Sequence, residues 1–421
     1  MNVTDTNPNA ARRWVVLLGL ALTYAATNGI LVHTLPLLYP HLMETFNWTP
    51  TQVTLPATVF YAVAAVTSPP AGYLLDRYSS RLVIAIGLVG IVSALFGYSM
   101  INELGQLVVV YIVFAFGLSM CGLVSNMLIL SRWFTELRGR ATGLLLMSSS
   151  IGGSIFPLIV GFFLATIGWR GGMQVLALIV AVVALLPIIF LVKDRPDHVP
   201  SGPRPKVPDG PPRTGPTLRQ ALSERRFYLL ALATAAVWFS IIAMVQHQSI
   251  YLAGEGGVAK SQLPMVFSAF FLCSVLGKLI FGWLSDHFDK TLMMLVSIAT
   301  LVVGLLLLRN VQIAGNASLF GYAVVAGIGF SGAFTMIQLM FADFYAGASF
   351  GRILAILMMV DTLAGAFGTR VVAVLRDSTG SYIAGIDLMM GLLALAFACV
   401  LILKPERAEK PMVKLPAGDE T

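Results

Sequence analysis

Residues 267–290 read FSAFFLCSVLGKLIFGWLSDHFDK, an apolar run of membrane-spanning length with one cation, Lys278, near its middle. About 20 apolar residues are enough to cross a hydrocarbon core of roughly 30 Å as a helix. An ammonium group inside such a helix is costly unless it has a partner or faces a water-filled cavity. Lys278 is therefore the first candidate for a functional site.

The end of this stretch repeats an earlier part of the chain. GWLSDH at 282–287 shares the pattern Gly-x-x-x-Asp plus a basic residue with GYLLDR at 72–77, 210 positions upstream. A second pair, RGRATG at 138–143 and FGRILA at 350–355, is separated by 212 positions. Similar offsets at two separate places predict two copies of a six-helix unit.

We expect the repeated loops to control movement between the two copies. The residues assigned to this role are Gly72, Asp76, Arg77, Arg81, Gly282, Asp286, Arg140 and Arg352. In the first loop, Gly72 is expected to let two helices approach closely, and Asp76 is expected to cap a helix or to pair with Arg77 and Arg81.

The composition indicates an integral membrane protein. Hydrophobic residues make up 57% of the chain and charged residues 11%, with a mean hydropathy of +0.84, whereas about a quarter of the residues of soluble proteins are charged. We predict an all-α membrane fold of twelve transmembrane helices in two pseudo-symmetric six-helix halves. The predicted spans are 14–38, 51–74, 82–101, 106–131, 141–165, 172–192, 227–252, 262–284, 291–308, 317–341, 353–375 and 382–403. The first run is too long for a cleaved signal peptide, so it is interpreted as helix 1.

Basic residues are distributed unequally between the two sides of these spans. With the N-terminus inside, the inner segments hold 21 of the 27 Lys and Arg residues and the outer segments hold four, while Lys278 and Arg370 lie within spans. The positive-inside rule then predicts that both termini are cytoplasmic, in a bacterial inner (plasma) membrane. Because topology explains the net charge of +7, nothing remains to indicate nucleic acid as a partner.

The predicted domains follow from the spans. They are a cytoplasmic tail over 1–11, a first half over 12–193, a linker over 194–226, a second half over 227–404 and a cytoplasmic tail over 405–421. The linker is rich in Pro, Gly and Arg and cannot bury a core, so we expect it to be extended and flexible. A regulatory or polyproline-binding role is the alternative interpretation of this segment.

The chain lacks the motifs of ATP-driven pumps and of enzymes. It has no phosphate-binding Walker loop, no metal-ligand cluster and no nucleophile elbow. We expect no catalytic residue, no metal and no other cofactor, so an ion or substrate gradient has to supply the energy. Cys121, Cys273 and Cys399 fall inside spans and are interpreted as small buried hydrophobic residues, without disulfides.

Twelve helices in two halves, with Gly-x-x-x-Asp-Arg/His loops after helices 2 and 8, resemble the major facilitator superfamily over nearly the whole chain. Three features resemble its monocarboxylate and oxalate/formate branch. They are SRWFTELRGRATGLLLMSSSIGG at 131–153, RDSTGSY at 376–382, and Lys278, four residues before Gly282, where relatives carry a helix-8 arginine that binds the substrate carboxylate.

Three positions depart from the animal members of that branch. Ser274 stands where those members have an aspartate, and His33 stands where they have a lysine in helix 1. Arg12-Arg13-Trp14 replaces an Asp-Gly-rich motif before helix 1.

The resemblance implies a secondary transporter whose two halves rock around a site near the bilayer midplane. It implies a small organic anion as the substrate, such as lactate or pyruvate, moved by proton symport or by anion exchange, with the monomer as the functional unit. The expected partners are thus the anion, a proton or counter-anion, and the lipid bilayer.

Two alternatives are kept open. A proton-driven exporter of amphipathic drugs within the same superfamily would be favoured by a bulky cavity lined by Met and Phe. A non-transporting membrane receptor on the same fold belongs to another class, and the short polar C-terminal tail argues against it.

Lys278 and Asp361 are predicted to lie at a similar depth in the membrane. Lys278 precedes Asp286 by eight residues and Asp361 follows Arg352 by nine, so both lie about 12 Å from the cytoplasmic end of a helix that rises 1.5 Å per residue. One interpretation is a fixed salt bridge between helices 8 and 11. In the other, Lys278 binds the substrate carboxylate, and protonation of Asp361 frees the lysine for it.

Arg370 lies in the outer third of helix 11, at a depth comparable to that of Asp387 in helix 12. It is interpreted either as a partner of Asp387 or an interfacial snorkel, or as a residue at the outer entry of the substrate path.

His33 and His247 are 214 positions apart, close to the repeat offset, so they are expected to be equivalent in the two halves. Each is either a hydrogen-bonded core residue or a ligand for substrate or proton. Neutral hydrogen-bonding candidates are Tyr24, Asn28, Tyr61, Asn126, Gln246 and Gln338. We assign substrate binding to Lys278, His33, His247, Asn28, Arg370 and Tyr61, and proton coupling to Asp361 and His33.

Overall fold

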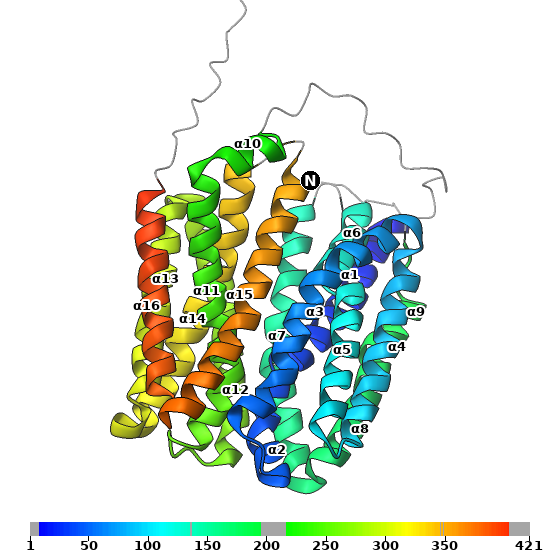
Figure 1. Ribbon diagram of the computed structural model, residues 1–421. Coiled ribbons are helices and arrows are strands. Elements are labelled where there is room, and N and C mark those ends of the chain that lie inside the picture. Colours follow the sequence, from blue (N-terminus) through cyan, green and yellow to red (C-terminus); the bar gives the residue numbers. More distant parts are fainter. Residues whose placement is uncertain (1–7, 135–136, 195–215, 346, 348, 404–421) are drawn as a thin grey trace, which may run out of the picture.

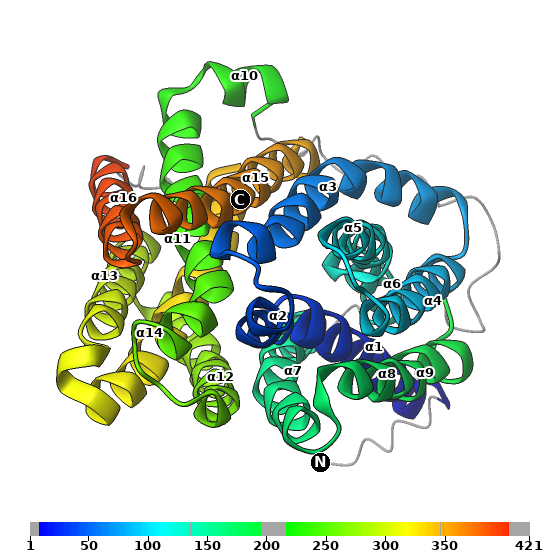
Figure 2. The same cartoon turned by 60° about the horizontal axis from the view of Figure 1, so that its bottom comes forward.

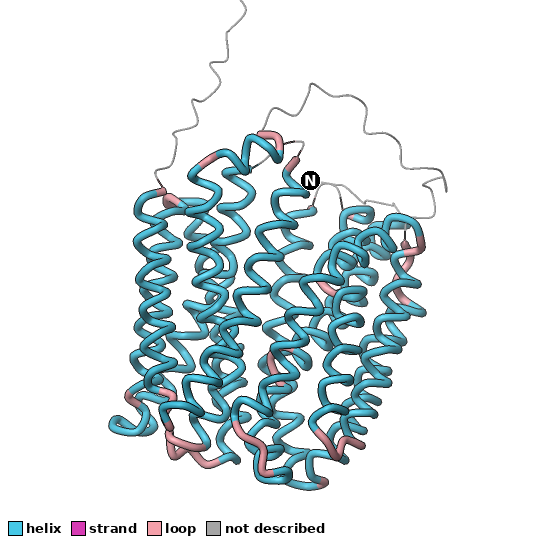
Figure 3. Tube along the Cα trace, in the orientation of Figure 1, coloured by secondary structure: helices cyan, strands magenta, loops and turns pink. Residues whose placement is uncertain are grey.

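Every regular element in the described part of the chain is a helix (Figures 1 and 3). The computed structural model describes residues 8–134, 137–194, 216–345, 347 and 349–403. Within these residues, twelve segments are long and apolar enough to cross a membrane. Helices form here because in hydrocarbon a helix satisfies its backbone hydrogen bonds within one segment. The prediction of twelve spans is confirmed.

The first half of the molecule contains six spans. They are α1 (Pro8–Leu31), continued by η1 (Leu35–Leu38) and α2 (Tyr39–Phe46); α3 (Pro50–Arg77); α4 (Ser80–Ser99); α5 (Leu104–Cys121), continued by α6 (Leu123–Trp133); α7 (Arg138–Thr166); and α8 (Gly168–Val180), continued by η2 (Ala181–Leu185) and α9 (Leu186–Phe190).

The second half contains the other six spans. They are α11 (Arg225–Ala253); α12 (Leu263–His287), preceded by η3 (Lys260–Gln262); α13 (Lys290–Arg309); α14 (Val311–Tyr345); α15 (Phe350–Thr379); and α16 (Ile383–Ile402).

The two halves stand side by side and touch mainly through two helix pairs (Figure 2). α3 packs against α15, and α7 packs against α12. In the duplication α3 corresponds to α12 and α7 corresponds to α15, so these pairs are equivalent interfaces. We term the end of the bundle with Arg77, Arg138, Arg225 and Arg352 the basic face, and the end with α2 the opposite face (Figure 1).

Helix starts show the duplication in local structure. The Ser79 hydroxyl accepts the backbone N–H of Leu82 at the start of α4. At the start of α13, 210 residues later, the Asp289 carboxylate accepts the N–H of Leu292. Both caps satisfy a donor that a helix leaves unpaired in its first turn.

Close helix crossings repeat as well. A Cβ added at Gly152 would lie 2.1 Å from the Ala25 carbonyl oxygen, where α7 crosses α1. A Cβ at Gly368 would lie 2.4 Å from the Phe239 carbonyl oxygen, where α15 crosses α11. Glycine therefore sets the approach of equivalent helix pairs in both halves.

The first span is longer than predicted. Its expected end at residue 38 is followed directly by α2, which runs to Phe46. Pro40 does not stop the chain because proline is tolerated in the first turn of a helix, where its missing N–H would have no partner. The next helix, α3, starts at Pro50, close to the predicted start at 51, with the Thr49 hydroxyl accepting the N–H of Gln52.

The predicted extended linker is corrected at its C-terminal end. Residues Leu218–Ser223 form the short helix α10, which lies at the basic face (Figure 1). Thr217 and Gln220 cap it reciprocally, an arrangement that satisfies two backbone donors. Residues 195–215 of the predicted linker, like the predicted tails over 1–7 and 404–421, lie outside the described residues.

Candidate functional site

A cavity of about 250 Å³ lies between the halves and extends toward the basic face as far as Gly72 and Leu75. Its walls come from the first span, α3, the α5–α6 junction, α11, α14 and α15. The lining residues are Tyr24, Asn28, Val32, Phe60, Tyr61, Ala64, Ser68, Gly72, Leu75, Leu118, Ser119, Gly122, Leu123, Val124, Trp238, Ile242, Phe334, Gln338, Met358, Asp361 and Thr362. Neither α7 nor α12 contributes a residue to this lining.

Asp361 is the single acidic or basic side chain in that lining. It is 3% exposed, and the Thr234 hydroxyl of α11 donates a hydrogen bond to its Oδ1 at 2.8 Å. A carboxyl group in this position can hold or release a proton next to a bound molecule.

Lys278 lies outside the lining, at the interface of α12 with α7. Its Nζ donates to the Leu146 carbonyl oxygen at 2.7 Å and to the Ser149 hydroxyl at 3.3 Å. On its other side Nζ lies 5.5 Å from the ring centroid of Phe334, which does line the cavity. One aromatic ring therefore separates the ammonium group from the cavity.

The expected pair between Lys278 and Asp361 is not formed in this structure. Lys278 bonds to α7, whereas Asp361 bonds to α11. The predicted depths of the two residues match, but the residues lie at different helix contacts, because α12 packs on α7 whereas α15 packs on α11 and α3. Depth along a helix says nothing about the direction that a side chain takes around it.

His33 is enclosed by aromatic rings from the second half. Its ring centroid lies 4.0 Å from that of Phe271 and 6.3 Å from that of Phe330. Its Nδ1 has no hydrogen-bond partner among the described residues. His33 is buried beside the cavity and is not part of its lining.

Three neutral candidates from the sequence do line the cavity on the side of the first half. They are Tyr24, Asn28 and Tyr61. Asn28 Nδ2 is buried without a hydrogen-bond partner in the described part of the chain. A buried donor without a partner is costly, so this amide is free to bind an acceptor in the cavity.

Gln246 joins the halves at the end of the cavity that faces away from the basic face. It donates to the Tyr61 hydroxyl at 3.1 Å and accepts from the Tyr39 hydroxyl at 2.7 Å. Nearby, the Ser249 hydroxyl of α11 donates to the Pro36 carbonyl oxygen. These bonds tie α11 to the first span and to α3.

His247 is directed away from the cavity, so its equivalence to His33 does not extend to its contacts. Its Nε2 donates to the Thr369 carbonyl oxygen at 2.8 Å, and its Nδ1 lies 3.2 Å from the Tyr382 hydroxyl. Burial raises the pKa of Tyr382, which keeps the phenol neutral. His247 thus ties α11 to α15 and to the start of α16.

Arg370 acts at the opposite face. It donates to the Thr51 carbonyl oxygen at 3.3 Å, and Asp377 accepts the Thr51 N–H at 3.1 Å, so α15 holds the first turn of α3 at two points. The expected pair of Arg370 with Asp387 is wrong, because Asp387 pairs with Arg309 at 2.9 Å.

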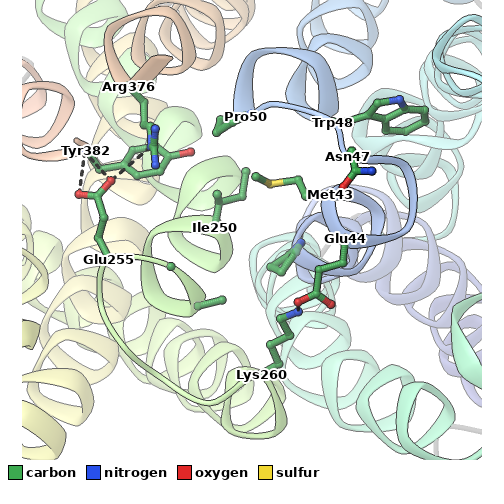
Figure 4. Close-up of a pocket in the computed structure, with 13 residues that line it drawn as sticks. Met43, Glu44, Asn47, Trp48, Pro50, Ile250, Glu255, Lys260, Arg376 and Tyr382 are labelled. Atoms are coloured by element: carbon green, nitrogen blue, oxygen red, sulfur yellow. Dashed lines mark hydrogen bonds and ion pairs between the residues drawn. The ribbon is translucent and has the colours of Figure 1, made fainter. Parts of the chain in front are cut away.

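A second pocket, of about 470 Å³, lies between the halves at the opposite face (Figure 4). Lys260 of the second half pairs with Glu44 of the first across it. On its other side Glu255 pairs with Arg376 at 3.3 Å and accepts the N–H of Tyr382. The cations and carboxylates of this pocket are thus already paired with each other.

The repeated loops at the basic face differ from expectation. A Cβ at Gly72 or Gly282 would meet no atom within 4 Å among the described residues, so neither glycine serves a close helix approach in this structure. Arg77 donates to the Tyr73 hydroxyl at 2.8 Å. The side chain of Asp76 lies outside the described residues, and Asp286, Arg140 and Arg352 are exposed.

Arg81 does not depend on Asp76 for a partner. Its backbone N–H donates to Asp194 at 2.8 Å, and its guanidinium donates to the Ile189 carbonyl oxygen. Ser79 also donates to Asp194. The loop after α3 is therefore fastened to the end of the sixth span.

Some site residues were missed by sequence reasoning, chiefly Thr234, Phe334 and Ser149. Thr234 and Phe334 look like ordinary residues of apolar helices, with no signal of their own. Ser149 belongs to a run of three serines at 148–150, which is unusual in a membrane helix and is the one available signal. Asn126, in contrast, donates to the Cys121 and Gly122 carbonyl oxygens, so it supports the break between α5 and α6.

Comparison with known proteins places the chain in a family. The family model of the Major Facilitator Superfamily matches residues 15–253 and 248–419. The chain is 25% identical to Monocarboxylate transporter 11 of Homo sapiens over 94% of its own length and 83% of that protein. It is 25% identical to MFS transporter asaE of Aspergillus flavus, with 76% of the chain and 67% of the relative covered.

Two further likenesses are coarser. Membrane sensor protein UhpC of Salmonella typhimurium is 25% identical over 59% of this chain, and the matched part spans 58% of that relative. A solved bacterial homolog of the human lysosomal transporter Spinster, in an inward-facing and unoccupied conformation, superimposes with a TM-score of 0.65 at 16% identity, over 94% of this chain and 95% of that one. At that identity the likeness shows the fold. From the family match over nearly its whole length, the chain belongs to the Major Facilitator Superfamily and is a multi-pass membrane transporter of that family.

Proposed function

We propose that the protein moves a small organic anion, most directly a monocarboxylate such as lactate or pyruvate, by alternating access. One observation carries the proposal. Lys278 Nζ, within the membrane-spanning bundle, has two neutral oxygen partners and no carboxylate partner among the described residues. Because an ammonium group without a counter-charge is costly there, a substrate carboxylate would be a favourable ligand. Relatives named monocarboxylate transporters support the same class.

The halves over 12–193 and 227–404 are proposed to rock as units around the central cavity. Contacts at the opposite face would open as the halves close at the basic face. The excess of Lys and Arg supports a cytoplasmic basic face, with both termini inside a bacterial plasma membrane.

The predicted site residues are proposed to divide into three groups. Lys278 and Asn28 bind the substrate, Tyr61 shapes the cavity, and Asp361 carries the coupled proton with His33 beside it. His247 and Arg370 hold helices together, since each bonds to protein groups away from the cavity lining. The repeated loops at the basic face limit the movement of the halves.

A drug exporter is the second candidate, and one observation favours it. The lining is aromatic, with Phe60, Trp238 and Phe334, and it contains no Lys or Arg among the described residues. The volume of about 250 Å³ is compact and suits a small anion better than a drug-sized molecule. A membrane receptor, the third candidate, is supported by the likeness to a named sensor protein.

The test is uptake of radiolabelled lactate, pyruvate, oxalate and formate into proteoliposomes, with and without an inward proton gradient. Gradient-stimulated accumulation is expected for a symporter, and accumulation only into anion-preloaded vesicles is expected for an exchanger. Binding without flux would indicate a receptor, and no accumulation of any anion would favour the exporter.

Lys278→Ala is expected to abolish this uptake while leaving the protein folded in the membrane. Lys290→Ala is the matched control, because Lys290 pairs with Asp343 at the basic face, away from the cavity. Wild-type uptake by Lys278→Ala would contradict the site.

A further inference from the structure

We infer that Lys278 is shared between the substrate and α7, so that an anion must displace the contact between the two halves in order to bind. This inference rests on the proposed function and adds a coupling step to it. The contact consists of Lys278 of α12 and the Leu146 carbonyl and Ser149 hydroxyl of α7. We term these three groups the lysine clasp.

The hydrogen bonds of the lysine clasp are chemically consistent. The Ser149 hydroxyl donates its proton to the Leu146 carbonyl oxygen at 3.2 Å, which leaves its lone pairs to accept from Nζ. The same carbonyl accepts from Nζ at 2.7 Å. Lys278 therefore binds two acceptors in the other half, and its third N–H has no hydrogen-bond partner among the described residues.

The lysine clasp is one of three polar contacts along α7 and α12. The Ser268 hydroxyl donates to the Ser154 carbonyl oxygen at 2.6 Å, and the hydroxyls of Ser150 and Ser274 lie 3.0 Å apart. Along each helix these contacts progress toward the basic face, and the lysine clasp comes last. Of the three contacts it is thus the nearest to the basic face, toward which the cavity extends.

The position of the lysine clasp in the duplication singles it out. Ser149 stands 212 positions before Asp361, and Ser68 stands 210 positions before Lys278. At the equivalent interface, Ser68 and Asp361 both line the cavity. The Ser68 hydroxyl donates to the Ala64 carbonyl oxygen, and Asp361 accepts from the Thr234 hydroxyl. Among the described residues, a side-chain hydrogen bond joins the two helices at this depth only in the copy with the lysine.

The anion competes with the two acceptors of α7, the Leu146 carbonyl and the Ser149 hydroxyl, for the same ammonium group. A carboxylate is a stronger acceptor for an ammonium group than a carbonyl or a hydroxyl, because the bond is then charged on both sides. For Nζ to meet an anion in the cavity, it must leave α7 and pass Phe334. Substrate binding then removes the polar link between α7 and α12 that lies nearest to the basic face, and allows these helices to separate at that end.

The first test measures the distance between the halves without requiring transport. Spin labels at Gly139, in the first turn of α7, and at Phe288, directly after α12, occupy exposed positions at the basic face. They report the distance by electron spin resonance in a background without the three native cysteines. Lys278→Met without ligand is expected to shift or broaden the distance distribution relative to the unsubstituted protein. Saturating lactate is expected to cause the same change in the unsubstituted protein and none in Lys278→Met.

The second test is kinetic and concerns Ser149 as a positioning residue. Ser149→Ala weakens the hold on Lys278, so the KM for lactate is expected to fall about twofold to tenfold. Ser149→Thr keeps the hydroxyl and is expected to restore the KM. A merely structural serine would leave the KM unchanged or raise it.

The outcomes separate this inference from the proposed function. Identical distance distributions for Lys278→Met and the unsubstituted protein without ligand would overturn the inference even if lactate is transported. Lys278→Met could change the distance distribution while lactate does not change it in the unsubstituted protein. Together with no uptake of any carboxylate, this result would reject both the proposed function and the release of Lys278 from α7 by an anion. A lower KM in Ser149→Ala with the expected distance changes would support both.

Discussion

The two interfaces between the halves, α3 with α15 and α7 with α12, are built from equivalent helices of a duplicated unit and yet differ in kind. Between α7 and α12, polar contacts follow one another from Ser268 to Lys278. Between α3 and α15, contacts at Thr51 hold the opposite face, and the helices then diverge around the cavity, where Ser68 and Asp361 lie. The comparison teaches that equivalent helices keep equivalent packing, while different residues at equivalent positions place the cation at one interface and the carboxyl at the other.

The two interfaces are therefore proposed to have different roles. The interface of α7 with α12 holds the group proposed to recognise the anion, and that of α3 with α15 holds the group proposed to carry the proton. Charges kept at separate interfaces do not neutralise each other in the resting protein. Each therefore remains able to respond to its own ligand.

Among the variants that test the difference between the two interfaces, Asp361→Asn is expected to have the largest effect. This change removes the one ionisable acid of the cavity lining while keeping its size and its bond to Thr234. Stimulation of lactate accumulation by a proton gradient is expected to be lost, a decrease of at least about tenfold, because no proton can be exchanged there. Anion exchange between preloaded vesicles is expected to persist.

The control for this variant is Asp343→Asn, an exposed carboxylate paired with Lys290. Gradient stimulation is expected to be unchanged in it. Retention of full gradient stimulation by Asp361→Asn would move proton coupling to another group, with His33 as the next candidate.

A smaller effect is expected from the hydroxyl pair of α7 and α12. Ser150→Ala or Ser274→Ala leaves one buried hydroxyl without its partner, and each is expected to destabilise the protein by about 0.5–2 kcal/mol, the range of interhelical hydrogen bonds in membranes. The double variant is expected to cost less than the sum of the two. Thermal unfolding in detergent measures the stability of the two single variants and of the double variant against that of the unsubstituted protein.

Thr362→Val is the matched control for the hydroxyl pair, because Thr362 stands 212 positions after Ser150 and lines the cavity at the other interface. It is expected to leave the unfolding temperature nearly unchanged. Strictly additive losses for Ser150 and Ser274 would show that the two hydroxyls do not interact.

The smallest effect is expected at the opposite face from Lys260→Gln, which removes the ion pair with Glu44 (Figure 4). Because the Glu44 side chain is 67% exposed and the Lys260 side chain 31% exposed, water screens the pair, and its loss is expected to cost at most about 1 kcal/mol. The population open at this face is then expected to rise no more than about fivefold. The rate at which a thiol reagent labels Ile250→Cys, a residue that lines this pocket, would measure the open population.

High salt provides the control, since screening should reduce the difference between Lys260→Gln and the unsubstituted protein. A change of a hundredfold in labelling would show that this pair, rather than the contacts at Thr51, keeps the opposite face closed.

Much of the fold could be predicted because it depends on local patterns. These patterns act through neighbouring residues in the chain. They are the apolar runs of helical length, the repeated motifs at 72–77 and 282–287, and the capping residue Thr49. The first span ran past its expected end because Pro40 lies where a helix tolerates proline. The predicted end of this span at residue 38 left Pro40 outside the predicted helices.

The candidate site was only partly predictable. Lys278 and Asp361 are conspicuous as charges in apolar helices, and Asn28 and Tyr61 indeed line the cavity. The partners were not predictable, because a helix position gives depth but the crossing of several helices decides direction. Arg370 illustrates this: its depth matched Asp387, but the packing of α15 on α3 turned it to Thr51.

By itself, the sequence determined that this chain crosses a membrane twelve times in two related halves with one lysine and one aspartate at matching depth, because hydrophobicity and repetition are properties of the chain. Only the tertiary structure decided that the lysine bonds to α7 and the aspartate to α11, so that the two side chains do not pair. The physical reason is that the direction of a side chain depends on the rotation of its helix, to which close crossings such as Gly152 on Ala25 contribute. That rotation emerges from many packed contacts at once and is written in no single stretch of sequence.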